Sequence, residues 1–154
     1  MRRSRFRYLL VVGTAVVLLV LPTGAAAQTT YNLSGVEVNA NPATFVGVLV
    51  EQPGTWQAVV QHGTLNKTPG GITLITGGAF SISPLGASTI TGIIVSGQLQ
   101  AGPIGGSFFC TQSFAVSGLL TSGSFGGVLM HFGIRSGTSC NALFATFTGV
   151  ATFS

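Results

Sequence analysis

The chain has 154 residues, of which 46% are hydrophobic and only 5% are charged. Its net charge of +4 comes from the four arginines among the first seven residues, because the remaining charged side chains balance to zero: Lys67 and Arg135 against Glu37 and Glu51. Beyond the first residues the sequence therefore lacks the net positive charge typical of proteins that bind nucleic acid or anionic lipid, and both classes of partner are excluded.

The first residues have the pattern of an export signal. The four arginines precede an apolar stretch from Tyr8 to Leu21, and the small residues Ala25-Ala26-Ala27 follow Pro22. A basic head, a short apolar segment and a small-residue cleavage site predict a secretory signal peptide over residues 1–27. An uncleaved anchor is the alternative, but it needs about 20 apolar residues to cross a bilayer. We therefore expect one all-β domain over residues 28–154, secreted or at the cell surface, without a transmembrane helix.

Two cysteines remain in the predicted domain, Cys110 and Cys140. An even number of cysteines in an exported chain indicates a disulfide, and this pair lacks the close spacing typical of metal ligands. We predict a Cys110–Cys140 disulfide and no metal or other cofactor.

Glycine and proline divide the rest of the sequence into short segments rich in Val, Ile, Thr and Phe, which are strand-forming residues. Turn signals include Gly77-Gly78 and Gly102-Pro103. Between the turns the sequence predicts about nine strands, at residues 30–39, 43–51, 55–64, 72–76, 79–83, 88–100, 112–121, 124–135 and 142–153. Many short strands favour an antiparallel barrel of about 8–10 strands, with a β-sandwich as the alternative. A closed barrel is preferred because it has no exposed strand edges, which this chain has few charges to protect.

Alternation along the strands assigns side chains to faces. Trp56, Ala58, Val60 and His62 share one face, as do Leu143, Ala145, Phe147, Ala151 and Phe153. In the strand around His131, the row Val128, Met130, Phe132 and Ile134 is uninterrupted and is predicted to form the core face. Phe125, Leu129, His131 and Arg135 would then lie on the other face, which is either solvent or a barrel interior.

Few side chains are suited to catalysis. Glu37 is predicted to point outward between Val36 and Val38, and Glu51 to lie in a solvated turn. A carboxylate pair of the kind used by glycosidases would need both of them. A metal site of two histidines and one carboxylate would need His62, His131 and one glutamate, and no spacing supports it. The sequence has no aspartate for a Ser-His-Asp triad and no G-x-S-x-G motif. We therefore assign no catalytic residue and no metal ligand, and we favour a non-enzymatic protein.

Three segments carry a resemblance: GTWQAVVQHGTL (54–65), ITGGAFSI (75–82) and VLMHFGIRSGTSC (128–140), together with the final Thr/Phe strand. In these the chain resembles small secreted bacterial all-β proteins of unassigned function, a likeness that implies export and fold but no activity. Gly54-Thr55-Trp56 is similar to the opening of avidin-type barrels, but the aromatic ligand walls of those barrels are missing. The general layout is similar to barrels of the lipocalin and dirigent kinds, which hold small apolar molecules.

Three hypotheses about function follow. The first is an exported binding or structural module that acts on a small apolar ligand or a cell-surface component. The second is a small-molecule barrel with isomerase- or cyclase-like chemistry, which predicts a pocket lined by the speculative ligand-binding residues His62, His131, Arg135 and Trp56. The third is an outer-membrane β-barrel, which needs a polar interior and aromatic girdles that one Trp and two Tyr scarcely supply.

Overall fold

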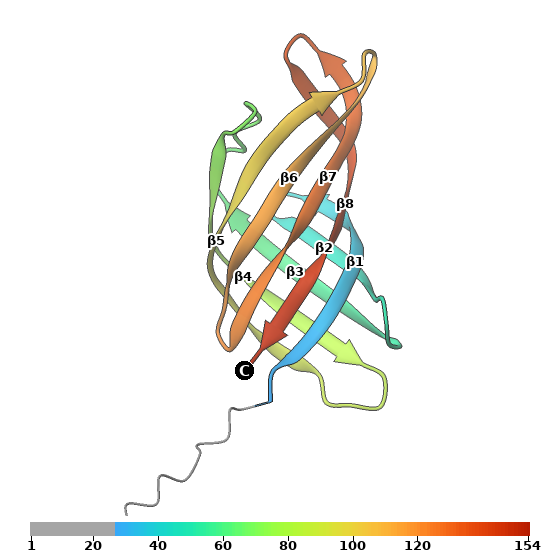
Figure 1. The fold of residues 1–154 in the computed structure, drawn as a ribbon, viewed down its shortest axis with the longest axis vertical. Helices are drawn as coiled ribbons and strands as arrows, with labels where there is room; N and C mark the ends of the chain where they lie inside the picture. The colour runs from blue at the N-terminus through green and yellow to red at the C-terminus, as the bar shows by residue number, and fades with distance from the viewer. Residues whose placement is uncertain (1–26) are drawn as a thin grey trace, which may run out of the picture.

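The computed structural model describes residues 27–154, and every regular element among them is a β-strand. The strands are β1 (Thr29–Ala40), β2 (Ala43–Leu49), β3 (Gly54–His62), β4 (Ile72–Pro84), β5 (Ile90–Gly105), β6 (Phe109–Leu120), β7 (Gly123–Ser136) and β8 (Ser139–Phe153). Each strand pairs antiparallel with its neighbours in sequence, and β8 returns to pair with β1 (Figure 1). The predicted all-β antiparallel barrel is confirmed, with eight strands rather than the nine read from the sequence.

The difference in strand number arises at Gly77-Gly78, which was predicted to be a turn. β4 runs through both glycines, and the pairing register with β3 shifts opposite them, between Gln61 and His62. Gly78 has a φ of 148°, and a Cβ atom there would collide with the carbonyl oxygen of Val59. The two glycines therefore allow a bend within one long strand, as barrel walls require.

Gly102-Pro103 is the second predicted turn that lies inside a strand. β5 continues to Gly105, and its register with β6 shifts between Ala101 and Ile104. Proline has no N–H to donate to a ladder, so it is tolerated at such an irregularity. The effect is to make β5 the longest strand, which extends one side of the barrel.

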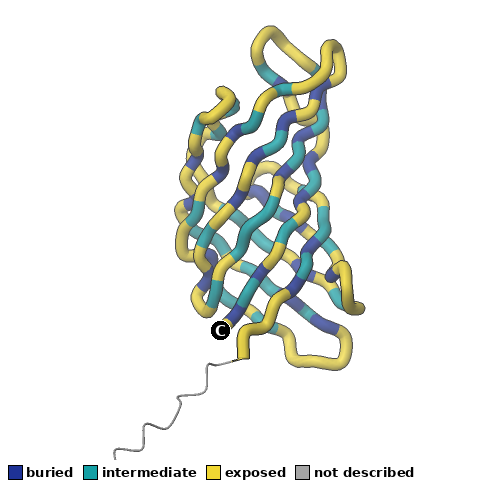
Figure 2. The backbone as a smooth tube through the Cα atoms, in the orientation of Figure 1, coloured by how far each residue is buried: buried dark blue, intermediate teal, exposed yellow. Residues whose placement is uncertain are grey.

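The core is the interior of the barrel, and it is formed by alternate side chains of all eight strands. Figure 2 shows this alternation of buried and exposed positions along each strand. Trp56 and Phe147 meet in the interior, with ring centroids 5.7 Å apart, and Phe147 also contacts Phe45. Buried alternate residues with exposed residues between them are what a sheet closed on itself produces.

Glycines in the wall make room for the largest interior side chain. Gly35 and Gly47 are paired across β1 and β2, and Trp56 lies beside them on β3. A Cβ atom on Gly35 would lie 2.6 Å from the indole carbon Cζ2, and one on Gly47 would lie 2.5 Å from the indole nitrogen. The indole N–H donates a hydrogen bond to the carbonyl oxygen of Ser34 at 3.1 Å, so the ring lies close against the backbone of the wall.

The prediction of which face of β7 forms the core was wrong. Val128 is 44% exposed and Met130, Phe132 and Ile134 are only partly buried, whereas Leu129 and His131 are buried at 5% and 7% exposure. The apolar row lies outside because a barrel of this size still has a large outer wall, and apolar side chains cover part of any protein surface. The interior instead takes the row that contains the histidine.

The two ends of the barrel differ. At the closed end, Tyr31, Phe80 and Phe153 pack with centroid distances of 6.0 Å for Tyr31–Phe153 and 5.7 Å for Phe80–Phe153. At the open end the β5–β6 and β7–β8 hairpins rise beyond the other strands (Figure 1). We call residues 102–111 and 132–144 the hairpin tips, and residues 63–71, which join β3 to β4 at the same end, the β3–β4 loop.

The predicted signal peptide lies outside the described residues except for Ala27. Within residues 27–154, no helix is long and apolar enough to span a membrane.

Candidate functional site

A cavity of about 310 Å³ occupies the barrel interior and is the candidate functional site. Apolar side chains from all eight strands line it, including Phe45, Trp56 and Phe147 at mid-height. Tyr31 and Phe153 are not part of the lining, since they lie beyond its floor at the closed end. The polar residues that contribute to the lining are Glu37, Gln57, His62, Lys67 and His131.

The charged and titratable members of this set gather toward the open end. Glu37 is near the end of β1, His62 is the last residue of β3, and Lys67 lies in the β3–β4 loop. Odd-numbered strands end, and even-numbered strands begin, at the same edge of this antiparallel barrel. The cavity therefore has an apolar body and a polar rim, which is a common arrangement in small-molecule sites.

Glu37 points into the barrel, and its predicted outward position was wrong. It is half-buried and lines the cavity, whereas Val36 and Val38 on either side are 46% and 58% exposed. Its partner across β2 is Phe45, which is also an interior residue. Burial raises the pKa of the Glu37 carboxyl above its usual value, and the nearby charge of His62 partly opposes that effect.

His131 lies deeper in the cavity, on β7, and packs against Phe114 with ring centroids 4.8 Å apart. Burial lowers the pKa of the imidazole to about 4, with smaller contributions from the charges of Lys67 and His62. Removing a cation from water penalises its charged form, so this histidine is neutral at pH 7. A neutral imidazole can accept or donate a hydrogen bond but adds no charge to the site.

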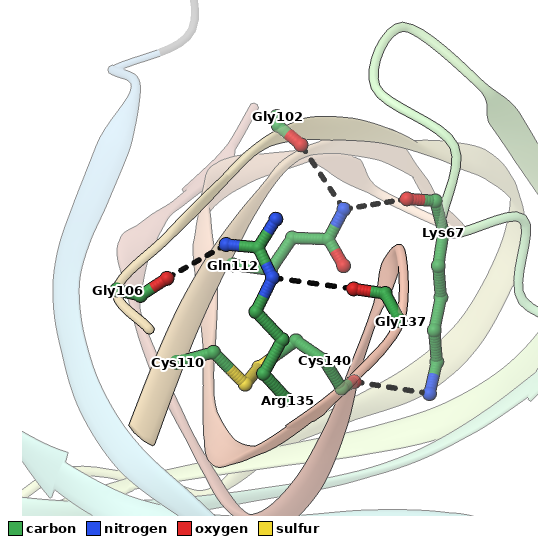
Figure 3. Close-up of a disulfide and its surroundings, with 8 residues drawn as sticks. All are labelled: Lys67, Gly102, Gly106, Cys110, Gln112, Arg135, Gly137 and Cys140. Atoms are coloured by element: carbon green, nitrogen blue, oxygen red, sulfur yellow. Dashed lines mark hydrogen bonds between the residues drawn. A yellow bond between two sulfur atoms is a disulfide. The ribbon is translucent and has the colours of Figure 1, made fainter. Parts of the chain in front are cut away.

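Gln112 is the buried polar neighbour of His131, to which it is paired across β6 and β7. It is only 1% exposed, and its amide nitrogen donates to the carbonyl oxygens of Lys67 at 2.7 Å and Gly102 at 3.0 Å (Figure 3). These two bonds fix the amide orientation. The amide oxygen Oε1 of Gln112 and the ring nitrogen Nδ1 of His131 are both buried without a hydrogen-bond partner in residues 27–154. Such atoms are usually satisfied by an ordered water or a bound polar group.

The same glutamine holds the β3–β4 loop over the open end. The loop is tied to β6 through the Lys67 carbonyl and to β8 through the Lys67 ammonium, which donates to the carbonyl oxygen of Cys140 at 3.3 Å. Within the loop, the Asn66 side chain accepts from the backbone N–H of Thr68 at 3.1 Å, an Asx turn. Leu65 and Lys67 of this loop thus form part of the cavity lining.

The predicted Cys110–Cys140 disulfide is confirmed, with an S–S distance of 2.07 Å. It joins β6 to β8 across the intervening β7, where Gly133 is the partner of Cys110. Arg135 braces the same region, because its guanidinium donates to the carbonyl oxygens of Gly106 at 2.6 Å and Gly137 at 3.3 Å. Figure 3 shows how these contacts connect the two hairpin tips.

The structure brings three of the four speculative ligand-binding residues to one cavity: Trp56, His62 and His131. Trp56 is 6% exposed in the wall, His131 lies in the interior, and His62 is exposed at the rim, where its Nδ1 atom lies 2.6 Å from the carbonyl oxygen of Gly63. Arg135 does not line the cavity, and it contacts hairpin carbonyls instead. A ligand-binding role for any of the four stays a prediction.

The two carboxylates do not form a pair. Glu51 lies in the turn between β2 and β3 at the closed end, whereas Glu37 faces the cavity near the open end. Among the described residues, no group of three or more His, Cys, Asp or Glu side chains is placed to hold a metal ion.

Gln112 was missed in the sequence, although a signal was present. Cys110, Gln112, Phe114 and Val116 alternate on one face of β6, and a glutamine among buried apolar residues indicates a side chain with fixed hydrogen-bond partners. The roles of Lys67 and the β3–β4 loop had no such signal, because they depend on contacts with strands more than 40 residues away in sequence.

Comparisons with protein families, with characterised proteins and with solved structures find no match to this chain.

Proposed function

We propose that this protein is exported and binds a small, largely apolar molecule in the interior of its barrel. The single observation that carries the proposal is the cavity of about 310 Å³, walled by aromatic and aliphatic side chains, with its charged and titratable side chains toward one end. Pockets for small molecules are about 300–1,000 Å³ and mostly apolar, with a few polar groups that orient the ligand. The cavity lies at the lower end of that range, which favours a compact ligand.

The polar rim supports an amphiphilic ligand, with its apolar part toward the closed end and its polar part near His131 and Lys67. His131 and Lys67 both line the cavity, so their ring and ammonium groups give such a polar group, or a water that accompanies it, hydrogen-bonding partners. An apolar interior also favours this function over an outer-membrane barrel, since the lumen of those barrels is polar. Export remains part of the proposal, and the disulfide is compatible with it.

Trp56 makes the proposal testable, because it is the only tryptophan in the chain and it lines the cavity. An uncharged naphthylamine dye titrated into the purified protein should quench Trp56 and take up its excitation energy. Ala58→Phe, which fills part of the cavity, should weaken dye binding by roughly tenfold or more through steric exclusion.

The matched control is Ala115→Phe, because Ala115 is exposed on the outer wall of β6 and the substitution is the same. This variant should bind the dye as the wild type does. If the wild type fails to bind the dye, or if the two variants bind it equally, the interior is not a binding site.

A second function is favoured by one observation, the presence of His131 and Glu37 in the same cavity lining. A neutral imidazole and a carboxyl of raised pKa are groups that can transfer protons, which would suit isomerase- or cyclase-like chemistry on the bound molecule. His131→Gln tests it: a variant that keeps dye affinity and loses turnover in a substrate screen would support catalysis. Equal turnover in variant and wild type would leave binding as the sole function of the cavity.

A further inference from the structure

We propose that the hairpin tips insert into the surface of a lipid bilayer, so that the cavity opens toward the membrane. The surface in question is the tip patch, which consists of Phe108, Phe109, Leu143 and Phe144, with exposed fractions of 64%, 72%, 70% and 56%. Phe144 also stacks on Phe132, with ring centroids 4.8 Å apart, and Phe108 packs edge-on against Phe109 at 5.0 Å.

The distribution of exposed aromatic side chains singles out this end of the barrel. The large exposed apolar side chains elsewhere on residues 27–154 are valine, leucine and isoleucine, spread over the outer wall except for Val50 and Leu85, which lie in separate turns at the closed end. Every exposed phenylalanine in that set belongs to the tip patch. Scattered aliphatic side chains are ordinary on a protein surface, whereas a contiguous aromatic cluster indicates an interaction site.

The patch is continuous with the cavity. Leu143 and Phe144 line the cavity at its open end, and they also line a surface depression with Phe109 and Phe132. An apolar ligand could therefore move between the bilayer and the barrel interior along apolar side chains without crossing water. This route rests on the proposed function, whereas docking of the tips does not.

Shape and charge favour a bilayer over a protein partner. The tip patch is carried by two hairpin ends that project beyond the other strands, as Figure 1 shows, so these side chains can reach a bilayer before the rest of the barrel does. Arg135 is the only charged residue in the hairpin tips, which hold no carboxylate to repel lipid phosphates. Because the predicted domain has no net charge, apolar insertion rather than attraction to anionic lipid must drive the binding.

Rigidity of the tips also suits insertion. The disulfide and the Arg135 hydrogen bonds connect the β5–β6 hairpin to the β7–β8 hairpin, so the aromatic side chains are presented together. A preorganised surface loses less conformational entropy on binding than a flexible one.

The experiment is flotation of the purified, disulfide-bonded protein with phosphatidylcholine vesicles at low and high salt. The wild type should float with the vesicles, and the binding should change little with salt. Phe109→Ser should weaken binding by about tenfold, because a large apolar side chain no longer leaves water. Leu119→Ser is the matched control, since Leu119 is 56% exposed on the same strand, β6, but near the closed end. It should bind vesicles as the wild type does.

Four outcomes overturn the proposal. The first is that the wild type does not float with the vesicles, and the second is that Phe109→Ser and Leu119→Ser lose vesicle binding equally. The third is that high salt abolishes flotation of the wild type. The fourth is that the wild type is a dimer that Phe109→Ser converts to a monomer. Light scattering measures this last outcome, which would show that a second copy of the chain covers the tip patch. Dye binding to Trp56 in vesicle-free solution separates the two proposals. Loss of flotation with normal dye binding contradicts only the membrane contact, and normal flotation without dye binding contradicts only the cavity ligand.

Discussion

The two ends of the barrel are built from the same strands but are stabilised in different ways. The closed end is held by aromatic packing of Tyr31, Phe80 and Phe153. The open end is held by a disulfide and by hydrogen bonds from Gln112, Lys67 and Arg135 to backbone carbonyls. Its hairpin tips bury little apolar area. The comparison indicates that aromatic packing stabilises the closed end, whereas a cross-link and hydrogen bonds stabilise the open end and leave it able to present a polar rim and an exposed apolar surface.

The largest expected effect comes from the closed end. Phe153→Ala should lower the free energy of unfolding by about 3–5 kcal/mol, because it removes a buried ring and leaves a space between Tyr31 and Phe80. Phe109→Ala at the open end removes the same ring from a side chain that is 72% exposed, so it should change stability by less than about 0.5 kcal/mol. Urea denaturation measures both values, and similar values would contradict the division between the two ends.

Removal of the disulfide is the next largest change. The double substitution Cys110→Ala and Cys140→Ala should lower stability by about 3–4 kcal/mol in the chain-entropy model, given the sequence separation of 30. Hydrogen exchange should then rise most in the hairpin tips and least around Tyr31 and Phe153. A uniform rise along all strands would mean that the bridge constrains the whole barrel rather than the open end.

His131 gives the open end a dependence on pH. Its pKa is about 4 in the folded protein against an ordinary value of 6.5, so the unfolded chain binds the proton more readily. Stability should fall as pH drops from about 6.5 toward 4, by up to about 3 kcal/mol from this residue. His131→Leu should remove that part of the pH dependence. Glu37 acts in the opposite sense, because its raised pKa favours the folded state at lower pH, and Glu37→Gln separates its contribution.

The smallest of these effects is expected at Gln112. Gln112→Leu keeps an interior side chain of similar size but leaves the carbonyl oxygens of Lys67 and Gly102 without their donor, at a cost of about 1–2 kcal/mol. Cleavage of the β3–β4 loop by a protease should become faster. Gln98→Leu is the control, since Gln98 is exposed on β5, and it should leave both stability and cleavage unchanged.

The closed end and the barrel wall were largely predictable from the sequence. Alternation placed Trp56, Ala58, Val60 and His62 on the inner face, where the structure has them, and placed Ala145, Phe147, Ala151 and Phe153 correctly. Leu143 was assigned to that inner face as well, but it is left unpaired by the register shift between Phe132 and Gly133, so it lies at the rim of the cavity and is 70% exposed. A period of two predicts faces only as far as the next bulge.

The open end was less predictable for the same physical reason. Glycine and proline mark both turns and bends within strands, and local sequence does not separate the two cases at Gly77-Gly78 or Gly102-Pro103. Glu37 was assigned outward because a carboxylate between valines is usually solvated, yet closure of the barrel turns the valines outward. The ties of Gln112 and Lys67 depend on strand order, which the sequence does not determine.

Pairing of the first and last strands has a practical consequence. Thr29 lies opposite Phe153 at the closed end, so the first and last strand residues of the barrel are adjacent and far from the rim. A short linker between these positions should allow circular permutation, with a new start in an exposed turn such as residues 85–89. Attachment through Thr29 or Phe153 would also orient the protein on a sensor surface with its cavity facing the solution. The fluorescence of Trp56 could then report a ligand that enters the cavity.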